Sequence, residues 1–155
     1  MIFRAVHFGR PIPQTRARAG RHGFYHCKRS SAYRHEIIQT LVLAAGTDFV
    51  PIDYPCRVSI KVSGARLNSD TDNHAKMVLD CLQYAKVLAD DSLRIVCKLE
   101  VEVDMGSKGA CTVIEIDDYQ GVKPPPPKPR GAKNEETKNE FREKRFARYF
   151  SKSNQ

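Results

Sequence analysis

The chain has 155 residues and 41% of them are apolar, which is enough for one hydrophobic core. No apolar run approaches the ~18 residues of a membrane span. The five widely spaced cysteines, without a CxxC pair, argue against a disulfide framework and a cysteine-based zinc site. The net charge of +8 is unevenly distributed: residues 1–35 hold eight basic and no acidic residues, residues 36–120 eight basic and fourteen acidic, and residues 121–155 ten basic and four acidic. Two basic segments typical of a polyanion binder therefore flank an acidic centre.

The first residues, MIFRAVHFGRP, lack the long apolar run of a secretory signal. The cysteines stand mostly in apolar surroundings, as is typical of reduced thiols in a protein core. We therefore expect a cytoplasmic protein in a reducing compartment, without a membrane partner.

The N-terminal third is predicted to be a strand, a basic loop and a helix. Residues 2–8 alternate as a strand does. Residues 9–23 are rich in proline, glycine and arginine and have no periodic apolar face, so we predict a basic loop, followed by a short strand at 24–27. From a cap at Ser30-Ser31 to Gly46, apolar residues recur at helical spacing and predict a helix.

The middle of the chain continues with three strands and one helix. Residues 57–63, 93–103 and 111–116 are predicted to be strands, and residues 73–86 carry the apolar stripe of a second helix. Strands and helices are mixed without strict alternation. This order predicts an α+β domain, with a small mixed β-sheet and two main helices packed on it.

The composition changes after residue 120. Residues 121–130 (GVKPPPPKPR) contain four consecutive prolines, which favour an extended and semi-rigid spacer. Residues 134–150 are predicted to form either a basic helix or a solvated tail. The chain is therefore divided into a domain at 1–120 and a proline-hinged basic tail at 121–155.

Two aspartates precede the second predicted helix. Asp70 and Asp72 are two residues apart, so in an extended segment both carboxylates face the same side. Asp72 or Asn73 is expected to cap the helix that follows. Two carboxylates and an amide therefore meet at one point of the chain.

Further charged residues extend this group. Lys76 and Asp80 follow Asn73 on one face of the predicted helix. After the helix the chain turns back through Asp90 and Asp91, which point to opposite sides if extended. We therefore expect one of these two carboxylates to face the pair that precedes the helix.

Three converging carboxylates repel one another unless a cation lies between them. Oxygen ligands alone favour Mg²⁺, with Mn²⁺ as a substitute, and such an ion activates water and stabilises phosphate oxygens. Lys76 would orient the water or neutralise the phosphate. Basic residues of the N-terminal segment would bind the flanking DNA phosphates: Arg10, Arg16, Arg18, Arg21, Lys28 and Arg29.

The two aspartates have two other interpretations. Asp70 and Asp72 alone would also suit turn and cap residues of a polar loop, but the surrounding charged residues argue against this reading. A calcium loop is rejected, because Ala75 and Cys81 stand where that loop needs glycine and glutamate.

The run DTDNHAKMVLDCLQ, followed by LADDSLRI, resembles the RusA family of Holliday junction resolvases. The N-terminal GRPIPQTRARAGRHGFYHCKRSSAYRHEI is similar to the proline- and arginine-rich opening of that family. The likeness covers about residues 2–117. Two positions depart from the family pattern, since Ser69 and Gln14 stand where the family often has a basic residue.

The resemblance implies a small homodimeric α+β endonuclease that cuts four-way DNA junctions by paired symmetric nicks with Mg²⁺ or Mn²⁺. It implies that Asp70, Asp72 and Asp91 are the essential aspartates and that Lys76 is the functional lysine. Asp90 and Asp80 fit the pattern with less defined roles. Asp90 would be a further metal ligand, and Asp80 would either support the metal ligands or belong to the dimer interface. A two-fold symmetric junction suits an isologous dimer with two identical sites, and residues 30–46 and 93–103 are candidates for its interface.

We therefore predict a metal-dependent crossover junction endodeoxyribonuclease of DNA recombination and repair, suited to a phage or prophage. Two alternatives stay open: a flap or fork nuclease of the same fold, and a non-catalytic module that binds branched DNA. Competition between a junction and flap or linear DNA distinguishes the first alternative from a junction resolvase. Mg²⁺-dependent nicking distinguishes a nuclease from the second alternative.

Overall fold

The computed structural model describes residues 1–15, 18–20, 23–25, 27–105 and 109–126. Met1–Pro124 form one compact unit, and a second unit begins at Pro125. The predicted tail helix at 134–150 lies outside the described residues. Among the described residues, no helix is long and apolar enough to cross a membrane.

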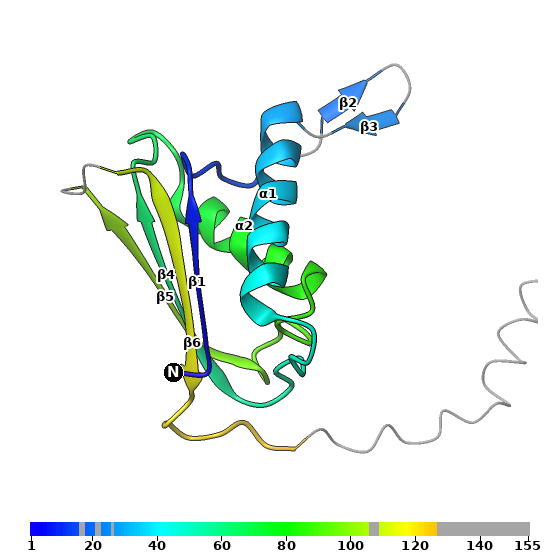
Figure 1. The fold of residues 1–155 in the computed structure, drawn as a ribbon, viewed down its shortest axis with the longest axis vertical. Coiled ribbons are helices and arrows are strands. Elements are labelled where there is room, and N and C mark those ends of the chain that lie inside the picture. Colours follow the sequence, from blue (N-terminus) through cyan, green and yellow to red (C-terminus); the bar gives the residue numbers. More distant parts are fainter. Residues whose placement is uncertain (16–17, 21–22, 26, 106–108, 127–155) are drawn as a thin grey trace, which may run out of the picture. The chain divides into compact units, whose positions relative to one another are not determined.

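A four-stranded sheet forms the base of the first unit (Figure 1). Its strands lie in the order β1 (Phe3–Phe8), β6 (Cys111–Asp118), β4 (Cys56–Ser63) and β5 (Val96–Asp104). The pairs β1–β6 and β4–β6 are antiparallel, whereas β4–β5 is parallel. The sheet is therefore mixed, and the predicted α+β class is confirmed.

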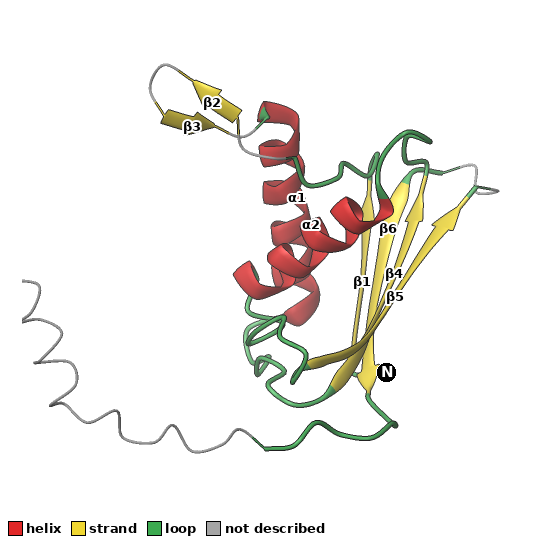
Figure 2. Cartoon of the chain, turned by 180° about the vertical axis from the view of Figure 1, so that it is seen from behind, coloured by secondary structure: helices red, strands yellow, loops and turns green. Residues whose placement is uncertain are grey.

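Helices α1 (Lys28–Ala45) and α2 (Thr71–Tyr84) lie on the same face of this sheet (Figure 2). Their apolar stripes pack against the inward-facing residues of β4 and β6. The largest fully buried side chains come from both layers: Ile37, Leu41, Met77, Leu82, Val58, Ile60, Ile114 and Ile116. One core between the sheet and the helices therefore holds the unit together.

The connection from β4 through α2 to β5 determines where the acidic residues lie. Because β4 and β5 are parallel, with Cys56 opposite Val96 and Ser63 opposite Asp104, the chain must travel back along the sheet between them. Helix α2 makes this return. Its first turn follows the carboxyl end of β4, and the segment after it reaches the amino end of β5.

A separate hairpin precedes α1. Its first strand lies in the predicted loop at 9–23, and its second strand overlaps the short strand predicted at 24–27. Strands β2 (Arg18–Gly20) and β3 (Gly23–Tyr25) pair antiparallel, with Gly20 opposite Gly23. The glycines suit the turn of a hairpin. In Figure 1 the hairpin projects beyond the first turn of α1.

Two predicted helix caps differ from the structure. Helix α1 begins at Lys28 after Cys27, and Ser30 lies inside it, buried, with its hydroxyl donating to the carbonyl oxygen of Pro13 (3.4 Å). Helix α2 is preceded by Asp70 as N-cap residue, two to three residues earlier than expected. The residues that were predicted as caps make other contacts: Ser30 binds Pro13, and Asn73 binds Asp70 and Asp72 from inside α2.

Candidate active site

Asp70 and Asp72 lie at the start of α2. Asp70 is the N-cap residue with an extended backbone, and Asp72 belongs to the first turn. Asn73 links them: its side-chain amide donates to Asp70 Oδ2 (3.0 Å) and its backbone N–H donates to Asp72 Oδ1 (2.9 Å). Both carboxylates are exposed at the positive end of the helix dipole. This pair offers oxygen ligands suited to a hard divalent cation.

A pocket of about 340 Å³ opens beside Asp70. We call it the Asp70 pocket. It is formed by the segment after β1, the start of α1, the loop after β4 and the first turn of α2, and its lining residues are Arg10, Pro11, Ile12, Pro13, Cys27, Arg29, Arg66, Asn68, Ser69, Asp70 and Asn73. A carboxylate therefore shares this pocket with three arginines.

The loop before Asp70 is anchored to α2 by a buried histidine. His74 is 4% exposed, and its Nε2 lies 2.9 Å from Ser69 Oγ. Burial lowers the pKa of His74 below its usual value, so the ring is neutral at pH 7. Ser69 in turn donates from its hydroxyl and its N–H to the carbonyl oxygen of Arg66 (2.6 and 3.0 Å). His74 therefore has a structural partner at the site.

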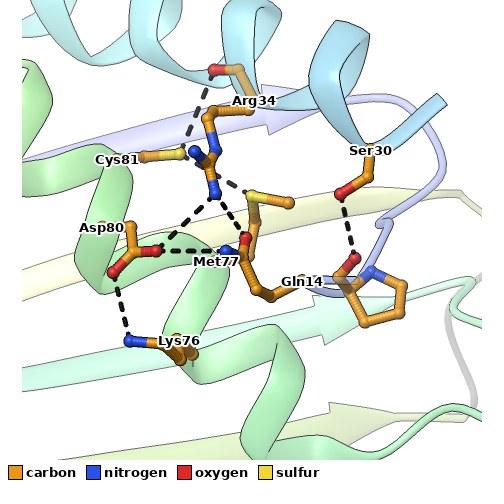
Figure 3. A network of polar contacts seen from close by, with 8 residues as sticks. Gln14, Ser30, Arg34, Lys76, Met77, Asp80 and Cys81 are labelled. Atoms are coloured by element: carbon orange, nitrogen blue, oxygen red, sulfur yellow. Dashed lines mark hydrogen bonds and ion pairs between the residues drawn. The ribbon is translucent and has the colours of Figure 1, made fainter. Parts of the chain in front are cut away.

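The Asp80 carboxylate contacts two cationic side chains and one amide side chain (Figure 3). Its carboxylate lies 3.6 Å from an Arg34 guanidinium nitrogen and 3.4 Å from Lys76 Nζ, and it accepts from the Gln14 amide (3.3 Å). Arg34 also donates to Gln14 Oε1 (2.6 Å). We call these four residues the Asp80 network. It joins the N-terminal segment to both helices.

Lys76 is the most exposed of the charged residues in this network, with 61% of its side chain accessible. It lies one turn after Asp72 on α2, as the sequence predicted. Among the described residues, the Lys76 ammonium group forms one ion pair, the long one with Asp80. Lys76 is therefore free to reach a ligand bound near the start of the helix.

Asp90 and Asp91 lie at the other end of α2. The segment 87–89 pairs with Ile52, just before β4, so the two aspartates that follow it lie near the amino ends of β4 and β5. Both are exposed, and the Asp91 N–H donates to Asp90 Oδ1 (2.9 Å). Within the described part of the chain, no three acidic, histidine or cysteine residues cluster as a metal site would require. The expected convergence of three carboxylates is therefore absent from a single chain.

Four of the six predicted DNA-binding residues lie in the described part of the chain. Arg10 and Arg29 line the Asp70 pocket, and Lys28 is exposed at the start of α1. Arg18 belongs to β2, whereas Arg16 and Arg21 lie outside the described residues. Arg66, which was not predicted from the sequence, lines the pocket from the loop after β4. Its spacing from Asp70 gave no periodic signal, because the loop is neither strand nor helix.

The family model for the endodeoxyribonuclease RusA matches residues 9–117. The chain belongs to the RusA family. This match includes the N-terminal segment, both helices, the Asp70 pocket and both aspartate pairs, so the resemblance seen in the sequence is confirmed. No curated protein matches the chain significantly. RusA-family membership supports endonuclease activity on Holliday junctions, which are branched DNA.

Proposed function

We propose that this RusA-family protein is a Mg²⁺-dependent endonuclease that resolves four-way DNA junctions by paired cuts, with Mn²⁺ as an alternative metal. The observation that carries the proposal is the position of Asp70 and Asp72 at the start of α2, next to a pocket lined by three arginines. Oxygen ligands suit the metal, and guanidinium groups suit the phosphates of DNA. The same arrangement explains why basic segments flank an acidic centre.

Each residue has a defined task in this proposal. Asp70 and Asp72 hold the metal, and Asn73 fixes the orientation of both carboxylates through its two hydrogen bonds. When bound, the metal supplies an activated water and charge stabilisation at the phosphate. Lys76, exposed one turn away, neutralises the phosphate that is attacked or orients the water. Arg10 and Arg29 hold neighbouring phosphates.

Asp91, with Asp90 beside it, completes the metal site from a second chain. Helix α2 has 14 residues and therefore spans about 20 Å, and it separates Asp70 and Asp72 from Asp90 and Asp91. Metal–oxygen bonds are only about 2 Å long, so carboxylates at opposite ends of the helix cannot share one ion within a chain. A two-fold homodimer brings the start of one α2 to the far end of the other. Two identical sites then act on the two opposed strands of a symmetric junction.

The decisive test is cleavage of a four-way junction by Asp72→Asn with and without Mg²⁺. We expect cleavage to be lost and junction binding to be retained or strengthened, because a negative charge near the phosphates has been removed. Asp48→Asn, at an exposed aspartate beyond α1, is the matched control and should cut normally. Normal cleavage by Asp72→Asn would contradict the assignment.

The two alternatives have separate outcomes in the same assays. A flap or fork nuclease would prefer those substrates when they compete with a junction at equal concentration. A non-catalytic binding module would show no Mg²⁺-dependent nicking. It would also show no Mg²⁺-dependent rise in melting temperature, because an ion that binds the native site stabilises the fold.

A further inference from the structure

The Asp70 pocket contains cationic groups without acidic partners. Arg10, Arg29 and Arg66 line it, and none forms an ion pair with another described residue. Three other described arginines are paired with carboxylates: Arg4, Arg34 and Arg57. Among the described residues that line the pocket, Asp70 is the only acidic one, so these residues have a formal charge of +2. An anion would therefore gain three guanidinium partners there.

The backbone of Arg66 is held in place by the contacts that follow it. Because Ser69 donates both its N–H and its hydroxyl to the Arg66 carbonyl oxygen, residues 66–69 form a closed turn. The Ser69 oxygen then accepts a hydrogen bond from Nε2 of the buried His74. The turn is thus fixed to α2, and the Arg66 side chain starts from a defined position beside Asp70. Preorganised donors lose less entropy when they bind a ligand.

The size and lining of the pocket indicate what kind of anion it binds. A volume of about 340 Å³ corresponds to roughly ten water molecules at ~30 Å³ each, which is more than a single phosphate ion needs. Pro11, Ile12 and Pro13 add apolar surface to the lining of the pocket. This combination fits a phosphate together with its sugar, since guanidinium groups bind phosphate oxygens in pairs and the apolar surface can contact the deoxyribose.

We propose that Arg66, together with Arg10 and Arg29, binds a backbone phosphodiester of the DNA next to the one that is cut. This inference rests on the proposed function for the DNA ligand and for the place of the cut, whereas the binding of a phosphate by Arg66 does not depend on cleavage. The pocket adjoins Asp70, so the bound phosphate places its neighbour in the strand at the metal site. Arg66 positions the strand and takes no part in the reaction itself. Binding at this subsite does not need the metal.

The test measures binding of a labelled four-way junction in EDTA, where no cleavage occurs, across a series of salt concentrations. Arg66→Ala is expected to weaken binding about tenfold, the effect of losing one charged hydrogen-bonding group. The slope of the logarithm of the binding constant against the logarithm of the salt concentration should become shallower by about one, because one ion fewer is released on binding. Arg66→Lys, which keeps the charge but not the paired donors, should lie between Arg66→Ala and the unaltered protein. Arg66→Gln is measured in parallel and should match Arg66→Ala.

Arg4→Ala is the matched control, because it removes the same charge from the sheet face opposite the helices. It should bind the junction as the unaltered protein does. The inference is overturned if both Arg66→Ala and Arg66→Gln bind with unchanged affinity and salt dependence, or if Arg4→Ala loses as much. If the protein binds but never cuts with Mg²⁺, and Arg66→Ala still weakens binding, the nuclease proposal fails and the phosphate subsite stands. If the protein cuts the junction with Mg²⁺ but the Arg66 variants bind with unchanged affinity, the phosphate subsite fails and the nuclease proposal stands.

Discussion

Asn73 connects the two aspartates at the start of α2 to the N-terminal segment. Its amide and N–H donate to Asp70 and Asp72, while its carbonyl oxygen accepts from the Gln14 N–H (2.9 Å). The same Gln14 side chain lies between Arg34 and Asp80. The proposed metal ligands and the segment that carries Arg10 are therefore held by one set of contacts. A glutamine suits position 14 better than a basic residue, because its side-chain amide both donates to Asp80 and accepts from Arg34.

Asp80 is expected to stabilise the fold and not to bind the metal. Its carboxylate is 22% exposed and faces the half-buried Arg34, so Asp80→Asn should lower the free energy of unfolding by about 1 kcal/mol in urea titrations. Lys76→Met, which removes the exposed partner of the same carboxylate, should cost clearly less. The Mg²⁺-dependent rise in melting temperature should persist in Asp80→Asn. Its loss would show that Asp80 is a ligand instead.

Two buried thiols and one buried phenolic hydroxyl are expected to make the fold less stable at alkaline pH. Burial raises the pKa of Cys56 from 9.0 to about 11, that of Cys81 from 9.0 to about 12, and that of Tyr33 from 10.0 to about 12. Above pH 9 the unfolded chain releases these protons before the folded chain does. Each group should therefore lower the free energy of unfolding by about 1.4 kcal/mol per pH unit between its ordinary and its raised pKa.

Urea unfolding at pH 8, 9, 10 and 11 checks this pH dependence. The expected course is a plateau up to about pH 9 and a progressive loss of stability above it. Cys81→Ala removes one of the three groups, so its stability should fall less steeply above pH 9. An identical slope in both proteins would show that the Cys81 thiol does not carry the effect.

The elements show which parts of the fold are predictable from local sequence and which are not. The apolar stripes of α1 and α2 and the alternation of β4 and β6 are local periodic signals, and the structure confirms these elements. The expected meeting of Asp91 with Asp70 and Asp72 was wrong within one chain. It assumed a local turn after α2, whereas the parallel pairing of β4 with β5 carries the chain to the far end of the sheet. That pairing is a long-range contact with no local signal.

Strand β5 is the element expected to form the dimer interface. It is an edge strand, and on the face that carries the helices Leu99 and Val103 are each 41% exposed, beside the buried Val58 and Val62 of β4. Antiparallel pairing of two β5 strands would cover these side chains. It would also place the amino end of one β5, near Asp91, beside the carboxyl end of the other.

Val103→Lys should therefore weaken the dimer, because it places a charge in the proposed interface. Sedimentation or light scattering at several concentrations measures the shift toward monomer. Val50→Lys, at a residue that is 80% exposed on the segment before β4, is the control and should leave the dimer unchanged. A Val103→Lys protein that stays as dimeric as the unaltered one would place the interface elsewhere.

At the scale of the whole molecule, the placement of the aspartates makes a strong prediction about mixed dimers. If each site combines Asp70 of one chain with Asp91 of its partner, neither Asp70→Asn nor Asp91→Asn alone has an intact site. A mixed dimer of these two variants has one site in which both aspartates are present. It should therefore nick one strand of a junction, and it should not complete the paired cut, since its other site lacks both carboxylates.

A second mixture makes the test independent of expression and folding defects. The double variant Asp70→Asn/Asp91→Asn, mixed with the unaltered chain, contains the same number of aspartates as the first mixture. In a shared arrangement its mixed dimer has no intact site, whereas in an unshared arrangement it keeps one. Separately tagged chains allow each mixed dimer to be purified and assayed with Mg²⁺ on a labelled junction. Nicking by the second mixture and none by the first would mean that each chain builds its own site. The chain would then have to move Asp91 along the whole length of α2, which the hydrogen bonds of residues 87–89 with Ile52 oppose.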